Sequence, residues 1–260
     1  MGQTAETRER DPVAARLFAR ARRNDPNAMT LVEHLSELRR RLIVAVIAFV
    51  IGSSVAAVFY QWMLNLLQHP FCDAEPHHCA FYVTGPLDPL ALRIKLAAFG
   101  GLLLASPIVL FELWRFVTPG LNRNEKRYVV PFVTISVILF VSGCALAYAV
   151  FPHALSFLQR VGGPSLHQIL SPNEYLSLIL VMMLLFGITF EFPVVLVGLQ
   201  LARVIRPSQL LHVWRWAVIA LTLVAAVFTP SADPFSMLIL AGPLIAFYFI
   251  SIALGKILVR

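Results

Sequence analysis

The chain has 260 residues, of which 58% are hydrophobic and 13% charged, with a formal net charge of +7 at pH 7. Its mean hydropathy of +0.77 is far above that of a soluble globular domain, and the apolar residues come in blocks of helix-spanning length. The composition therefore excludes an ordinary soluble domain and indicates an all-α polytopic membrane protein.

The first 28 residues are polar and rich in arginine, and they lack clear helical patterning. We expect residues 1–28 to form a disordered basic cytoplasmic extension. No short apolar segment with a cleavage site follows them, so the first span should be retained rather than removed as a signal peptide. Residues 29–258 are expected to form one transmembrane domain, without an internal repeat.

A helix is predicted to begin just before the first span. Thr30 and Glu33 have the spacing of a capping box. Glu37 follows on the same face as Glu33, and its simplest role is an ion pair with Arg41 one turn later. The helix should lie on the cytoplasmic interface, because one face carries an apolar stripe. That stripe consists of Leu31, Leu35, Leu38 and Leu42.

Hydropathy predicts six transmembrane spans, an even number that places both termini on one side of the membrane. Eighteen of the 21 lysines and arginines lie in segments on that side, and three lie on the other, so both termini should be cytoplasmic. The spread of these residues over several juxtamembrane segments argues against a nucleic-acid partner. The predicted spans are Leu42–Leu66, Leu90–Phe116, Tyr128–Phe151, Tyr175–Leu201, Val213–Phe228 and Phe235–Leu254.

Cys72 and Cys79 lie in the predicted external loop between the first two spans. An oxidising compartment would allow them to form a disulfide, and two free thiols are the other simple reading. His77 and His78 lie beside Cys79, but the spacing matches no recognised zinc site. We therefore predict no metal, and no other cofactor.

A second acid, Glu125, lies near the predicted start of the third span, at the same membrane surface as Glu37. With Asn122 it resembles a capping arrangement, so it can simply be a first-turn acid favoured by the helix dipole. Two carboxylates in Arg-rich surroundings can instead bind the guanidinium groups of an extended cationic peptide. An apolar floor beside Glu125 would hold the apolar part of such a peptide. The residues of this floor are Phe116, Pro119 and Leu121. The other explanation for these three residues is ordinary packing at a helix end.

The fourth span contains a carboxylic acid, Glu191, followed by Pro193. A charged side chain at bilayer depth costs about 2.5 to 3.5 kcal/mol on insertion scales, so Glu191 needs a partner or a wet cavity. The partner is either a polar residue on another subunit or a hydrogen-bonding group within the bundle. The fifth span is short for a hydrocarbon core of about 30 Å, so the bilayer should thin beside it.

Four motifs resemble the TatC family of the twin-arginine protein translocase, in order and in matching topological places. They are His34–Leu42, Ser106–Arg127, Phe190–Pro193 and Thr229–Pro234. The resemblance implies a cup-shaped receptor of six helices in the bacterial cytoplasmic membrane, with both termini inside. It implies that the receptor binds twin-arginine signal peptides and assembles, as a homo-oligomer in the lipid bilayer, with the single-span TatA-like and TatB-like subunits. The complex would export folded proteins using the proton-motive force.

The resemblance also implies roles for individual residues. Glu191 matches the intramembrane acid of the family. Asp233 matches an acid at the external start of the last span, although it can equally be an N-cap before Pro234. Met237 stands where some members have glutamine, which is a departure from the pattern. The signal-peptide-binding positions match Glu37, Arg39, Phe116, Pro119, Leu121 and Glu125.

Two other classes of function are less consistent with the sequence. A proton-coupled secondary transporter could use Glu191 as its relay, but such folds show repeated or broken helices in corresponding halves, and the sequence has no such symmetry. An intramembrane enzyme needs a nucleophile with a base, or a cluster of metal ligands, at matched depth. The spans have neither spacing, so we predict that the protein is not an enzyme.

Overall fold

The computed structural model describes residues 31–74, 83, 85–117, 129–161, 171–229 and 233–258. In these ranges all regular structure is helical, which confirms the all-α class. Residues 1–28, the expected extension, lie outside the described residues. The helices are α2 (Leu31–Val58), α3 (Tyr60–Ala74), α4 (Asp88–Val117), α5 (Val129–Val161), α6 (Pro172–Phe190), α7 (Phe192–Leu201), α8 (Pro207–His212), α9 (Trp214–Phe228) and α10 (Pro234–Leu258).

Five helical segments among the described residues are long and apolar enough to cross a bilayer, and a shorter apolar helix, Trp214–Phe228, lies where the fifth span was predicted. The multi-span architecture is therefore confirmed. The count of six crossings stays a prediction. The five segments are Leu35–Val58, Asp88–Phe116, Val130–Val161, Pro172–Leu201 and Pro234–Ile257.

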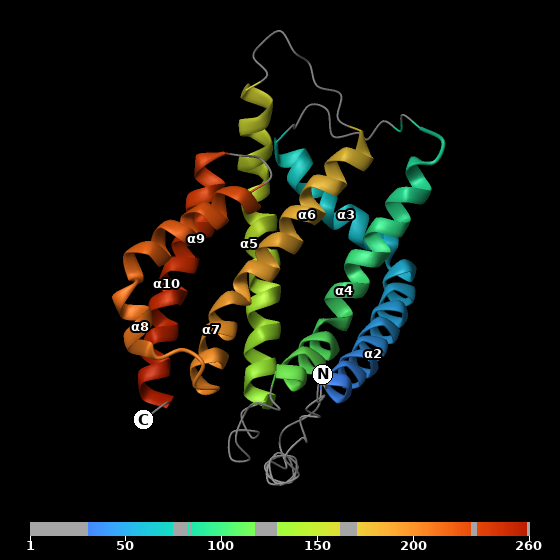
Figure 1. The fold of residues 1–260 in the computed structure, drawn as a ribbon. Coiled ribbons are helices and arrows are strands. Elements are labelled where there is room, and N and C mark those ends of the chain that lie inside the picture. The colour runs from blue at the N-terminus through green and yellow to red at the C-terminus, as the bar shows by residue number, and fades with distance from the viewer. Residues whose placement is uncertain are drawn as a thin grey trace, which may run out of the picture.

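The long helices lie side by side, and α2 begins at the same end of the bundle at which α10 ends (Figure 1). Buried apolar side chains from α3, α4, α5, α6, α9 and α10 form the main core. Leu96, Phe151, Leu176 and Leu240 are completely buried there. The same helices leave many apolar side chains exposed on the outside, as expected for surfaces that face lipid.

Among the described helices, α2 and α4 make the most extensive contact, and glycines allow them to approach closely. A Cβ added to Gly101 on α4 would lie 2.1 Å from the Ser53 hydroxyl oxygen on α2, and one added to Gly52 would lie 2.7 Å from the Gly101 carbonyl oxygen. Small residues let helix backbones approach closely in membranes. The contact lies in the second half of α2, and the ion pair of Arg41 with Glu112 joins the first half of α2, which carries Glu37, to the end of α4.

The first predicted span, Leu42–Leu66, is wrong in its second half. Helix α2 ends at Val58 and a separate helix, α3, begins at Tyr60. Helix α3 is held in its own direction by tertiary contacts: the hydroxyl of Tyr148 donates to the Leu66 carbonyl and that of Tyr175 to the Leu67 carbonyl, both at 2.8 Å. The apolar sequence continues through the turn at Phe59, so hydropathy could not reveal the break.

The fourth predicted span is interrupted at Glu191, which lies between α6 and α7. Its backbone remains helical (φ −72°, ψ −19°), so α6 and α7 follow one another as one slightly broken rod (Figure 1). Pro193 explains the interruption, because proline has no N–H to donate to a carbonyl of the preceding turn. The chain thus places its intramembrane acid at the one break in this rod.

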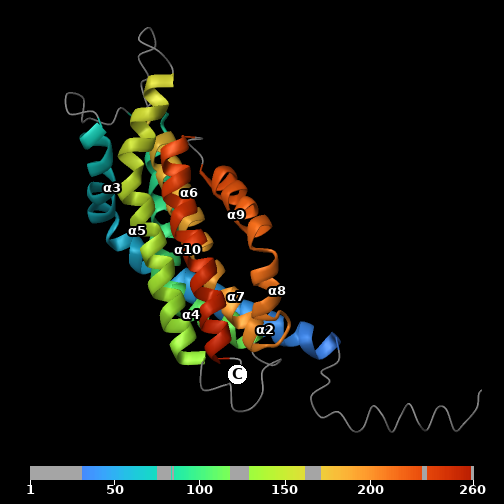
Figure 2. The same cartoon turned by 90° about the vertical axis from the view of Figure 1, so that its left-hand side faces the viewer.

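Two short helices, α8 and α9, lie one above the other on one flank of the bundle (Figure 2), and α9 lies where the fifth span was predicted. Tyr248 on α10 ties this flank to the bundle by donating to the Leu210 carbonyl at 2.7 Å. Only Leu221 and Ala225 of α9 are buried. Most of the surface of this short helix is therefore open to lipid or to a partner.

Candidate signal-peptide and partner sites

Three charged side chains from α2 and α4 meet at the end of the bundle where α2 begins. The Arg41 guanidinium pairs with Glu37 one turn earlier, and its Nε donates to Glu37 Oε1 at 3.2 Å. Its Nη1 donates to Glu112 Oε2 on α4 at 3.1 Å. All three side chains are largely covered, with exposed fractions of 12% for Arg41, 23% for Glu37 and 15% for Glu112.

The ion pair of Glu37 with Arg41, the simplest role predicted for Glu37, is present in the structure. The structure adds Glu112, which the sequence did not identify as a site residue. Glu112 lies in the last two turns of α4, between apolar residues, and no short spacing links it to Arg41. Only the packing of α2 against α4 brings them together. An acid among apolar residues near a helix end was the one signal available in the sequence.

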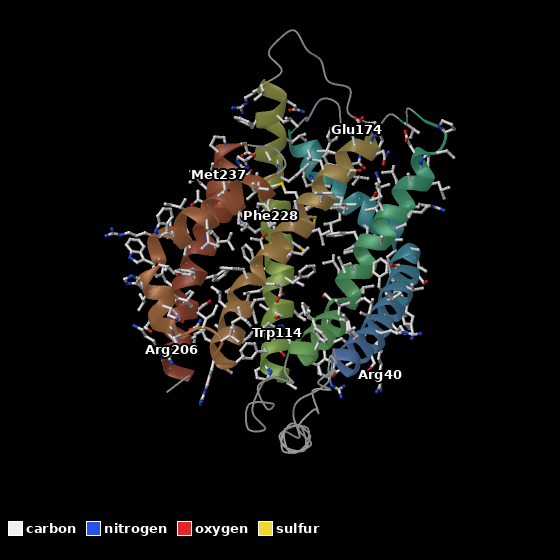
Figure 3. All side chains as sticks on the ribbon, viewed as in Figure 1. Arg40, Trp114, Glu174, Arg206, Phe228 and Met237 are labelled. Atoms are coloured by element: carbon white, nitrogen blue, oxygen red, sulfur yellow. The ribbon has the colours of Figure 1, made fainter. Side chains whose placement is uncertain are left out.

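The other expected signal-peptide residues are placed only in part. Arg39 is exposed and Phe116 is half-buried near the end of α4. Arg40, also exposed, marks the same end of the bundle in Figure 3. Pro119, Leu121 and Glu125 lie outside the described residues. The proximity of Glu37 to Glu125 therefore stays a prediction.

Glu191 lines a cavity of about 500 Å³ between α4, α5, α6, α7 and α9. The walls are almost wholly apolar, and Ser106 and Thr189 are the only other polar residues that line it. The Oε1 atom of Glu191 is buried and has no hydrogen-bond partner within the described ranges. The sequence predicted either a partner or a wet cavity for Glu191, and the residues that line this cavity are almost all apolar.

A chain of polar groups lies behind Glu191. Trp114 on α4 donates from its indole Nε1 to the Ser136 hydroxyl on α5 at 2.8 Å, in a fully buried position. Ser136 is in turn a hydrogen-bonding neighbour of the Glu191 carboxyl. Gly198 on α7 makes room for the indole, since a Cβ there would lie 2.6 Å from the Trp114 ring.

The position of Trp114 links the two candidate sites. Figure 3 shows Trp114 in the half of the bundle that also carries Arg40. Along α4, Trp114 lies two residues after Glu112 and two before Phe116. Neither Trp114 nor Ser136 was singled out from the sequence, because their pairing is a contact between α4 and α5.

Asp233 is buried at the start of α10, where its Oδ2 accepts a hydrogen bond from the Ser236 backbone N–H at 2.6 Å. The N-cap role weighed for it is therefore present. Met237, one turn further, is partly buried and packs against the main core. Figure 3 shows it at the end of the bundle opposite Arg40. It offers an apolar contact where a glutamine would offer a polar one.

Cys72, in the last turn of α3, is disulfide-bonded, whereas Cys144 is a buried free thiol. Cys79 lies outside the described residues, so its pairing with Cys72 stays a prediction. The part of the chain that the structure describes contains no group of three or more metal-ligating side chains.

The family model of the Sec-independent protein translocase protein TatC matches residues 33–243. The curated TatC of Frankia casuarinae is 36% identical over 255 residues, which cover 94% of this chain and 70% of the relative. That of Aquifex aeolicus is 38% identical over 235 residues, covering 89% of this chain and 97% of the relative.

Comparison with solved structures agrees with the family that the sequence relatives indicate. A crystal structure of the twin-arginine translocase receptor TatC has a TM-score of 0.71 and 38% sequence identity, covering 88% of this chain and all of that one. A second crystal structure of that receptor, in the detergent DDM, has a TM-score of 0.72 and covers 86% of this chain. The overall fold of this chain is thus a known architecture. This chain is a member of the TatC family of Sec-independent protein translocase proteins.

Proposed function

We propose that this chain is the receptor and core subunit of a twin-arginine translocase, and that it binds twin-arginine signal peptides on its cytoplasmic face. The observation that carries the proposal is the Glu37 carboxylate, which already holds a guanidinium group, that of Arg41, in a partly covered position. Carboxylates bind guanidinium groups in a planar, paired geometry that lysine does not reproduce. A site of this kind can tell arginine from lysine.

The peptide would be read by several residues together. Glu37 and Glu125 bind its arginines, and Arg39 is an exposed residue of α2, two positions after Glu37. The apolar stretch after the arginines rests on Phe116, Pro119 and Leu121. Burial of one large apolar side chain contributes about 1.5 to 3 kcal/mol, so this floor adds affinity without adding charge.

The second half of the proposal is assembly with TatA-like and TatB-like single-span subunits at the Glu191 cavity. Its Oε1 atom is a buried acceptor without a partner in the described ranges, and an apolar wall surrounds it. A partner helix that presents one polar side chain among apolar ones would satisfy both features. The rim supports a helical partner, because it exposes the apolar side chains of Leu113, Ile188 and Val195.

We place the protein in the bacterial cytoplasmic membrane, with both termini in the cytoplasm and as a homo-oligomer within the receptor complex. The charge bias of the loops supports this orientation. The common end of the bundle at which α2 begins and α10 ends also supports it (Figure 1). As a member of a translocase family, the protein is a transport component and not an enzyme. The alternative, a proton-coupled secondary transporter, is not favoured by that membership.

Site-specific photocrosslinking tests the receptor proposal in native membranes. A photoreactive residue at position 125 should crosslink to a twin-arginine signal peptide and not to a twin-lysine one. A matched probe at Glu174, at the opposite end of the bundle (Figure 3), should crosslink to neither peptide. Equal crosslinking of both peptides at position 125 would contradict the proposal, and solute flux through the purified protein alone would support the transporter instead.

A further inference from the structure

The charged cluster of Glu37, Arg41 and Glu112 holds two carboxylates and one guanidinium. Arg41 lies between the acids, with Oε1 of Glu37 at 3.2 Å from its Nε and Oε2 of Glu112 at 3.1 Å from its Nη1. The three side chains together carry a formal charge of −1.

Arg41 occupies the Glu37 carboxylate that a signal-peptide arginine would need. An exchange between the two guanidinium groups must not leave Arg41 without a partner, because a largely covered charge that loses its only counter-ion is strongly destabilising. Arg41 is only 12% exposed. Arg41 would keep a counter-ion in such an exchange, because Glu112 already accepts a hydrogen bond from another nitrogen of the same guanidinium.

We propose that Glu112 is a third acidic residue of the twin-arginine site, which retains Arg41 when an arginine of the signal peptide replaces it on Glu37. This inference rests on the proposed receptor function. In the unoccupied state Arg41 fills the place of one substrate arginine and bridges both acids. In the occupied state the peptide guanidinium pairs with Glu37, and Arg41 pairs with Glu112 alone. Glu112 thereby sets the affinity for arginine without contacting the peptide.

A purely structural role is the competing explanation, in which the bridge clamps α2 to α4. The two roles differ in what happens when both Glu112 and Arg41 are removed. If the bridge only holds α2 against α4, removing both Glu112 and Arg41 should impair peptide binding at least as much as removing either one. At an exchange site that lacks Arg41, the peptide arginine no longer has to displace Arg41 from Glu37.

The test measures binding of a fluorescent twin-arginine signal peptide to the full-length protein in lipid nanodiscs. Glu112→Gln should weaken binding by about ten- to hundredfold, the effect of one hydrogen bond to a charged group. Arg41→Gln should bind at least as tightly as the parent. The double variant Glu112→Gln with Arg41→Gln should regain the parental affinity, because the peptide arginine then no longer has to displace Arg41 from Glu37.

Glu174→Gln is the matched control, because it removes one acid at the opposite end of the bundle (Figure 3) and should leave affinity unchanged. If Glu112→Gln is not recovered as a monodisperse protein, Glu112→Asp keeps the charge at a shorter reach and should weaken binding in the same direction. Parental affinity of the Glu112 variant overturns the inference, and so does a double variant that binds as weakly as Glu112→Gln. A parent that fails to distinguish twin-arginine from twin-lysine peptides would instead contradict the receptor function itself.

Discussion

Replacement of Glu191 by alanine separates partner assembly from peptide binding. The side chain lines a cavity of about 500 Å³, and its Oε1 atom has no hydrogen-bond partner in the described part of the chain. A hydrogen bond across membrane helices contributes about 1 to 2 kcal/mol, so its loss should weaken the binding of a partner helix by about five- to thirtyfold. Glu191→Gln keeps a donor and an acceptor and should retain much of the assembly.

Glu191→Ala should weaken partner binding without lowering the stability of the isolated subunit. Alanine removes a carboxyl whose burial is costly, and it only enlarges a cavity that already exists. The thermal midpoint of Glu191→Ala in detergent should therefore equal or exceed that of the parent. Its affinity for a twin-arginine peptide should also be unchanged, since the charged cluster on α2 is not altered.

Copurification of TatA-like and TatB-like subunits with each variant is the assay, with peptide binding measured on the same samples. The reasoning predicts reduced recovery with Glu191→Ala and near-parental recovery with Glu191→Gln. Normal recovery of both partners and normal transport with Glu191→Ala would refute it. The carboxyl would then serve only the bundle, through its contact with Ser136.

Three further predictions concern the rest of the molecule. Glu37→Ala should weaken twin-arginine peptide binding by one to two decades, as measured by fluorescence anisotropy, and Glu37→Lys should weaken it more, because it adds repulsion; unchanged affinity would refute the role of this acid. Phe116→Ala should reduce photocrosslinking to the apolar part of the peptide while membrane insertion stays normal, whereas a protein that fails to insert would indicate helix-end packing instead. Gly101→Ala should lower the thermal midpoint, because the new Cβ would lie 2.1 Å from the Ser53 hydroxyl oxygen. The control change Gly242→Ala should lower it much less, because a Cβ there meets nothing within 4 Å apart from its chain neighbours, and only Pro243 after it opposes the new side chain. An equal fall in both variants would contradict the close contact of α2 with α4.

Hydropathy and residue spacing predicted the helical class, the membrane location and the places of the long spans, because bilayer thickness imposes a length that can be counted along the chain. They also identified Glu191 as a special residue, since an acid in an apolar run needs a reason to be there. The break beside it follows from Pro193, whose effect is local. These features depend on neighbours in the sequence.

The errors and omissions all depend on residues far apart in the chain. The end of α2 at Val58 reflects contacts that α3 makes with Tyr148 and Tyr175, which lie beyond residue 140. Glu112 meets Arg41 across 71 positions, and Trp114 meets Ser136 across two helices. The spacing of residues along the sequence does not predict such long-range contacts. They arise only when α2, α4 and α5 pack.

The central claim is that the face carrying Glu37 recognises paired arginines, and the most direct measurement is a comparison of two equilibrium affinities. The parent and Glu37→Ala, in lipid nanodiscs, are titrated with signal peptides that differ only in carrying two arginines or two lysines. The account predicts that the parent prefers the twin-arginine peptide by at least tenfold and that Glu37→Ala loses most of this preference. Equal affinities of the parent for the two peptides, or a preference that survives Glu37→Ala intact, would contradict it.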